Sequence, residues 1–144
     1  MDITIELAEK DNLSLLQSIL KQNDLPTDDI YNNSIRFFVA RENDRILGLV
    51  GLEVHKPFGL LRSLVVLNEF KNKQIGKKLV EYLMTVSKSE EIKELYLLTT
   101  TADKYFSKFG FIQVEREQVP DSIKQTEEFK SICPDSAEVM KKQL

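Results

Sequence analysis

Residues 60–86 place an apolar strand pattern directly before a helix pattern, with a lysine-rich loop between them. Residues 60–66 are apolar except for Arg62 and Ser63, which is typical of a mostly buried strand. From Ile75 to Val86 the apolar residues follow the spacing of one helix face. Any fold of this chain must therefore bury a strand that turns into an amphipathic helix.

The loop between these elements carries four lysines where the helix begins. Positive charge is unfavourable there, because a helix N-terminus has a partial positive charge and unpaired N–H groups. A bound anion would relieve this conflict, and Gly76 lets the backbone approach such a ligand closely. The alternative is a solvated lysine patch, and the phosphate-loop pattern GxxxxGK[ST] is absent. The lysines are Lys71, Lys73, Lys77 and Lys78.

Composition limits the class of protein. With 144 residues, 42% hydrophobic and 30% charged, the sequence predicts one globular domain over residues 1–144. Apolar runs are too short for a membrane span and the first residues do not resemble a signal peptide, so we expect a cytoplasmic protein. Cys133 and His55 are single, so we expect no internal disulfide and no metal site. A net charge of -3 argues against nucleic acid as a partner.

Local patterns predict an α/β protein in which a mixed sheet is flanked by helices. We expect a helix around Leu13–Leu20, a short helix that Thr100 or Thr101 caps and Gly110 ends, and a helix over 120–132 with Pro120 in its first turn. The expected strands cover residues 3–6, 35–40, 45–54, 60–66, 94–100, 111–116 and 136–142, and the short helix covers 102–109.

Three segments, LRSLVVLNEF, KNKQIGKKL and TTTADKYFSKFGF, resemble the cofactor-binding core of the GNAT superfamily of acetyl-CoA-dependent N-acetyltransferases. The family's loop pattern is Arg or Gln, two residues, Gly, one residue, Gly or Ala. Lys71 stands at its first position, Gln74 at its first glycine and Gly76 at its second. The resemblance covers about residues 3–114. The segments VPDSIKQTEEF and CPDSAEVMKK, with LLRSLVV, LYLLTTTA and LPTDD, further resemble small GNAT proteins encoded in bacterial arsenic-resistance operons.

This resemblance implies acetyl-CoA as cosubstrate, without a metal. It implies that residues 64–66 form a bulged strand end whose main chain, above all the Val66 N–H, bonds the pantetheine arm, and that the amides of 71–77 hold the pyrophosphate. The implied cofactor-binding residues are Leu64, Val65, Val66, Lys71, Asn72, Lys73, Gln74, Ile75, Gly76, Lys77, Thr99, Ala102 and Phe106.

The second motif departs from the family at one position. Its pattern Asn-x-x-Ala-x-x-Phe-Tyr-x-x-x-Gly-Phe places Phe106 where many relatives carry a tyrosine thought to protonate the thiolate. Tyr105 is one residue away, about 100° round the helix, so it is not expected to take the same place. The acid is then water or a nearby Ser or Thr, or no acid is needed, since a free thiol has a pKa of only about 8.5.

Two ionised residues, Glu53 and Arg62, stand in apolar strand patterns, where charge is costly unless paired or serving a ligand. One hypothesis makes Glu53 the acceptor of the amine proton and Arg62 the anchor of a substrate carboxylate. The other pairs them across neighbouring strands. His55 is expected at the surface in a turn, and Asp28 and Asp29 either rim the acceptor site or are solvated.

The sequence thus favours an N-acetyltransferase that acts on the amine of a small, amino-acid-like acceptor. Acetylation of a protein lysine or N-terminus is an alternative, and so is a coenzyme A-binding regulatory module without catalysis, which Phe106 in the tyrosine position favours. The expected partner is a small amine, not nucleic acid or a membrane, and a homodimer is possible.

Overall fold

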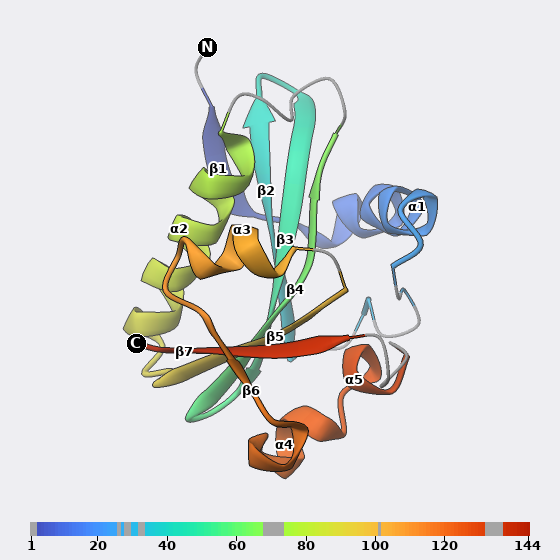
Figure 1. The fold of residues 1–144 in the computed structure, drawn as a ribbon. Coiled ribbons are helices and arrows are strands. Elements are labelled where there is room, and N and C mark those ends of the chain that lie inside the picture. The colour runs from blue at the N-terminus through green and yellow to red at the C-terminus, as the bar shows by residue number, and fades with distance from the viewer. Residues whose placement is uncertain are drawn as a thin grey trace.

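The computed structural model describes residues 3–25, 27, 30–31, 34–67, 74–100, 102–131 and 137–144. Its helices and strands follow one another in the order that the sequence patterns predict (Figure 1). They are β1 Thr4–Leu7, α1 Leu13–Gln22, β2 Ile35–Glu42, β3 Arg45–His55, β4 Phe58–Val66, α2 Ile75–Ser89, β5 Glu94–Thr99, α3 Asp103–Ser107, β6 Ile112–Val114, α4 Asp121–Lys124, α5 Glu127–Ser131 and β7 Glu138–Gln143, with 3-10 turns at Lys10–Asn12 and Arg116–Gln118.

Within the described residues seven strands form one mixed sheet in the order β1-β2-β3-β4-β5-β7-β6. The β4–β5 pair is parallel and every other neighbouring pair is antiparallel. The predicted mixed sheet flanked by helices is therefore confirmed.

Both faces of the sheet are covered by helices. On one face α2 and α3 pack onto β2, β3 and β4, with Leu79, Leu83 and Phe106 in that cluster. On the other face α1 packs onto β2 and β3 through Leu16 and Leu20. A third cluster joins α4 and α5 to β4, β5 and β7. Burying each amphipathic face in this way is the main source of a helix's stability in a protein of this size.

Strands β4 and β5 pair only at their starts. Their register covers Phe58 to Leu60 on β4, whereas β4 continues to Val66. The pairing of β4 with β3 is interrupted by a bulge, because Val65 faces Leu49 but Arg62 faces Gly51, which leaves one extra residue on β4. Beyond Leu60 the two parallel strands diverge, and the main chain of β4 on that side is open to a ligand.

Several element boundaries differ from the prediction. The helix expected over 120–132 is two helices, because the Thr126 hydroxyl accepts a hydrogen bond from the Phe129 N–H at 3.3 Å and starts a new helix there. Pro120 precedes the first turn of α4 instead of lying in it. Ala102 is the N-cap of α3 and makes no side-chain cap hydrogen bond, while its own N–H donates to the Thr99 hydroxyl at 2.8 Å; Thr101, one of the two expected caps, lies outside the described residues. Gly110 has the expected left-handed conformation, with φ of 94°.

Candidate functional site

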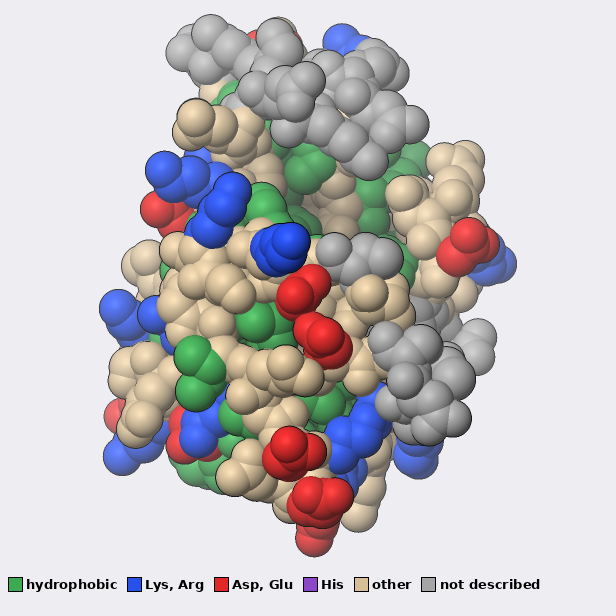
Figure 2. Space-filling view, in the orientation of Figure 1, with side chains coloured by type: hydrophobic (Ala, Val, Ile, Leu, Met, Phe, Trp, Pro, Cys, Tyr) green, Lys and Arg blue, Asp and Glu red, His purple; other side chains and the backbone are tan. Residues whose placement is uncertain are grey.

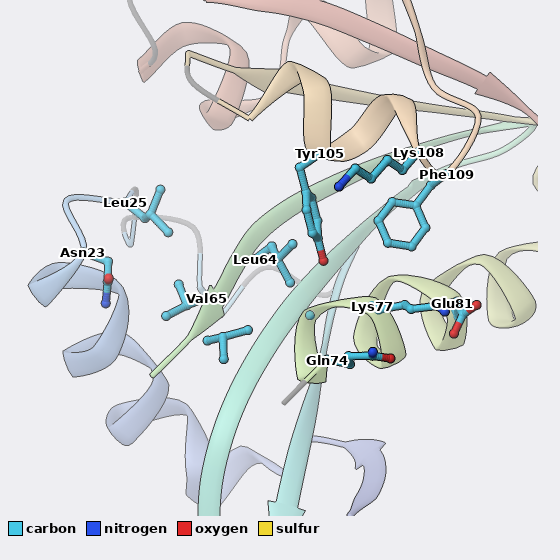
Figure 3. A pocket seen from close by; sticks show the side chains of 12 residues that line it. Asn23, Leu25, Leu64, Val65, Gln74, Lys77, Glu81, Tyr105, Lys108 and Phe109 are labelled. Carbon is cyan, nitrogen blue, oxygen red and sulfur yellow. The ribbon is translucent and has the colours of Figure 1, made fainter. Parts of the chain in front are cut away.

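A cavity of about 860 Å³ opens where β4 diverges from β5. Figure 3 shows its walls, with Leu64 and Val65 on β4, Gln74 and Lys77 at the start of α2, and Tyr105 on α3. Val66, Gly76, Glu81, Lys108 and Phe109 also line it, as do Asn23 and Leu25 after α1. The cavity therefore joins the three segments that carry the sequence motifs.

The main chain at the end of β4 faces this opening. The Leu67 N–H donates to the Leu47 carbonyl at 3.0 Å, toward β3. Because successive N–H groups point to opposite sides of a strand, the Val66 N–H points away from β3, toward the diverging β5. This is the donor that the sequence predicts for the pantetheine arm.

The start of α2 supplies further donors. The first hydrogen bond in the helix runs from the Lys78 N–H to the Gln74 carbonyl at 3.1 Å. The amides of Ile75, Gly76 and Lys77 precede it, and a helix gives such amides no acceptor of its own. Gln74 has φ of 59°, the left-handed conformation that favours glycine, at the position where the family pattern has its first glycine. The Ile75 side chain is fully buried in the core, so only its amide can serve a ligand.

Tyr105 closes the cavity from the side of α3. Its hydroxyl points toward the start of α2 in Figure 3, and a Cβ on Gly76 would lie 2.7 Å from that oxygen. Burial raises the pKa of the Tyr105 hydroxyl above its ordinary value. The hydroxyl therefore keeps its proton at neutral pH and can donate a hydrogen bond. Tyr105 was not among the predicted site residues, although it lies beside Phe106 within the second motif.

A second cavity of about 570 Å³ adjoins the first and shares Leu64 and Tyr105 with it. Its wall includes Arg62 and Ser63 from β4 and the buried Glu128 from α5. Besides Leu64, three further predicted cofactor residues line it, namely Thr99, Ala102 and Phe106. The two cavities are neighbours with shared walls, and together their linings reach from the start of α2 to α5.

Glu53 and Arg62 form the ion pair that one of the two hypotheses predicts. Arg62 Nη1 donates to Glu53 Oε1 at 3.1 Å, and both residues are buried. Arg62 lines the second cavity, whereas Glu53 lines neither cavity. His55 is not simply a surface residue, because its Nε2 lies 2.8 Å from Glu53 Oε2 and only 25% of its side chain is exposed.

The remaining predicted residues lie outside the described part of the chain. Of the residues discussed from the sequence, those outside the described part of the chain are Lys71, Asn72, Lys73, Asp28, Asp29 and Cys133.

Among the described residues, no group of three His, Cys, Asp or Glu could hold a metal ion, and no helix is long and apolar enough to cross a membrane. In Figure 2 hydrophobic side chains are recessed in the upper half of the visible face, with Lys and Arg side chains to their left.

Comparison with known proteins agrees with this geometry. Residues 33–113, more than half of the sequence, match the acetyltransferase (GNAT) domain. The chain belongs to the GNAT acetyltransferase family. A curated relative, the uncharacterized N-acetyltransferase CT2212 of Chlorobaculum tepidum, is 34% identical over 88 residues. That alignment covers 60% of this GNAT chain and 56% of the relative, so this chain spans little more than half of the relative's length.

Solved structures show the same fold at low sequence identity. A GNAT-family acetyltransferase from Staphylococcus aureus Mu50 has a TM-score of 0.79 with 22% identity, and the alignment covers 99% of both chains. N-acetylglutamate synthase from Neisseria gonorrhoeae, in complex with coenzyme A and N-acetyl-glutamate, has a TM-score of 0.82 with 15% identity, covering 100% of this chain and 35% of that one. The predicted GNAT fold is thereby confirmed.

Proposed function

We propose that this GNAT chain transfers an acetyl group from acetyl-CoA to the amine of a small acceptor that carries a carboxylate. The observation that supports the proposal best is the pair of joined cavities at the divergence of β4 and β5. One cavity offers main-chain donors beside the start of a helix, and the other has an arginine in its wall. The proposal takes residues 1–144 as one acetyltransferase domain that acts in the cytoplasm.

The first cavity fits acetyl-CoA. Its pyrophosphate would meet the amides of Ile75, Gly76 and Lys77, where the partial positive charge of α2 stabilises an anion. The side chain of Lys77 lines the cavity and adds positive charge, and Lys71, Asn72 and Lys73 precede it in the sequence. The pantetheine arm would then bond the Val66 N–H and run along Leu64 and Val65. Thr99, Ala102 and Phe106 would line its far end.

In the reaction the acceptor nitrogen attacks the thioester carbonyl, the new carbon–nitrogen bond forms as the carbon–sulfur bond breaks, and the amine gives its proton to water. Main-chain N–H groups directed at the carbonyl oxygen stabilise the charge that develops there. Phe106 has no proton to donate, so the thiolate leaves as such and is protonated by solvent, which its ordinary acidity permits.

Arg62 is the residue we propose for the acceptor carboxylate, because a guanidinium fork matches a carboxylate with two parallel hydrogen bonds. An amino-acid acceptor agrees with the N-acetyl-glutamate in the Neisseria structure, where it is a ligand of that protein. The resemblance to GNAT proteins of arsenic-resistance operons adds the prediction that this acetyltransferase contributes to arsenic resistance.

The test is thiol release from acetyl-CoA with three acceptor pools: amino acids, amines without a carboxylate, and peptides. The proposal predicts release with amino acids, weaker release with the matching amines, and little with peptides. Release with peptides alone would support protein acetylation. Tight binding of acetyl-CoA without release in any pool would support a non-catalytic coenzyme A-binding module, which Phe106 in place of the usual tyrosine favours.

A further inference from the structure

Three charged or titratable residues form a row on one side of the sheet. Glu53 and His55 lie two positions apart on β3, so their side chains project from the same face. Arg62 lies opposite Gly51 on β4 and projects from that face too. Glu53 is at the centre of the row, with its Oε1 3.1 Å from Arg62 Nη1 and its Oε2 2.8 Å from His55 Nε2.

The row runs from the cavity wall toward solvent. The Arg62 side chain is fully buried, the Glu53 side chain is 4% exposed, and the His55 side chain is 25% exposed. On either side of the row lie the two apolar clusters of this face, one under α1 with Ile35 and Phe37, the other under α4 and α5 with Leu60. A charge in such surroundings interacts strongly with its neighbours, because little water screens it.

Gly51 leaves the Arg62 stem room to cross β3. A Cβ on Gly51 would lie 3.1 Å from Arg62 Cγ and 3.1 Å from Phe37 Cε1. The Arg62 stem and the Phe37 ring therefore both lie close over Gly51, where a larger residue would leave them too little room. At the other end of the side chain, Nε donates to the Ser63 hydroxyl at 3.3 Å, and Ser63 has φ of 60° in the bulge. Glu53 is a partner of Nη1 and so helps to set the direction of the guanidinium.

Glu53 is badly placed to take a proton from the acceptor itself. It lines neither cavity, and a side chain of this chain engages each of its two oxygens. We infer that Glu53 and His55 are positioning residues, which hold the Arg62 guanidinium in the orientation that selects acceptors with a carboxylate. This inference rests on the proposed function, since it takes Arg62 as the carboxylate anchor.

The test compares two acceptors that differ only in the carboxylate: the best amino-acid acceptor and its primary amide. Glu53→Gln keeps the size of the side chain and removes its charge. We expect it to raise KM for the amino acid about tenfold and to leave KM for the amide and kcat for both nearly unchanged. His55→Gln should act in the same direction by about threefold, since it reaches Arg62 only through Glu53. Glu94→Gln is the matched control, because Glu94 is a sheet carboxylate paired with Lys141 and lines neither cavity.

Each other outcome has a distinct meaning. If kcat/KM falls equally for both acceptors, in proportion to a lower melting temperature, the three residues form only a structural ion-pair network and the inference is wrong. A fall of kcat for both acceptors with unchanged KM would make Glu53 the base and overturn it too. If Arg62→Lys leaves the preference for the amino acid over the amide unchanged, the carboxylate anchor of the proposed function is itself wrong. If Glu53→Gln does not fold, His55→Gln decides, because its side chain lies at the edge of the row.

Discussion

The hydroxyl oxygen of Tyr105 lies 2.7 Å from the point that a Cβ on Gly76 would occupy. The ring carbon Cζ of Tyr105 is 3.7 Å from the same point, an ordinary contact distance. Of the Tyr105 atoms, only the hydroxyl oxygen would therefore clash with a Cβ at position 76. This contact links the two family motifs, which lie far apart in the sequence, across the proposed cofactor cavity.

The first prediction is a coupling between these residues. Gly76→Ala alone should change the free energy of unfolding little. The higher helix propensity of alanine, worth up to about 1 kcal/mol, is offset by the clash of its Cβ with the Tyr105 hydroxyl. In a Tyr105→Phe background the same change should stabilise the protein. Urea unfolding of the two single variants and the double variant should give a coupling free energy of about 1 kcal/mol. Additive effects would show that the Tyr105 side chain does not lie against Gly76.

The second prediction concerns the left-handed conformation of Gln74, which has φ of 59°. Left-handed backbone costs a residue with a side chain roughly 1–2 kcal/mol. Gln74→Gly should remove this cost but lose about 0.5–1 kcal/mol through the greater backbone entropy of glycine in the unfolded chain. The free energy of unfolding should therefore rise by about 0.5 kcal/mol. Gln74→Ala is the control, because alanine keeps the strain. Denaturant unfolding that finds the two variants equally stable would contradict the strained conformation.

The third prediction is the ionisation of Tyr105. Burial raises the pKa of its hydroxyl above the ordinary value of 10.0. The folded protein should keep this proton where the unfolded chain has lost it, so stability should fall as the pH rises above about 10. Tyr105→Phe should make that fall less steep. The difference in phenolate absorbance between wild type and variant gives the pKa, and a midpoint at or below 10 would contradict the buried placement.

The order of the elements was predictable because it depends on local patterns. Alternating apolar residues mark the strands and helical spacing marks α2. The boundaries depend on single hydrogen bonds that no pattern shows. Thr126 divides the expected last helix in two because its hydroxyl accepts a helix-start amide. Ala102, and not the expected Thr100, is the N-cap of α3, and its N–H donates to the Thr99 hydroxyl just before the helix.

The candidate site was predictable in part. The family resemblance located Leu64 to Val66 and Gln74 to Lys77, which line the first cavity or border it. His55 was expected in a turn because the apolar strand pattern ends at Val54. β3 extends one residue further, and that residue joins Glu53 on the same side of the sheet. The cavities themselves follow from the register of β4 against β3 and β5, which is a non-local property.

The central claim is that acetyl-CoA binds between the end of β4 and the start of α2. The most direct measurement follows backbone amide resonances by NMR while coenzyme A is added. The account predicts saturable shifts at Val66, Ile75, Gly76 and Lys77. The hollow lined by Lys56, Lys88 and Lys93 provides an internal control, since it is rich in lysine but lies apart from both motifs. Saturable shifts confined to that hollow, or no saturable shift at Val66 and Gly76, would contradict the account.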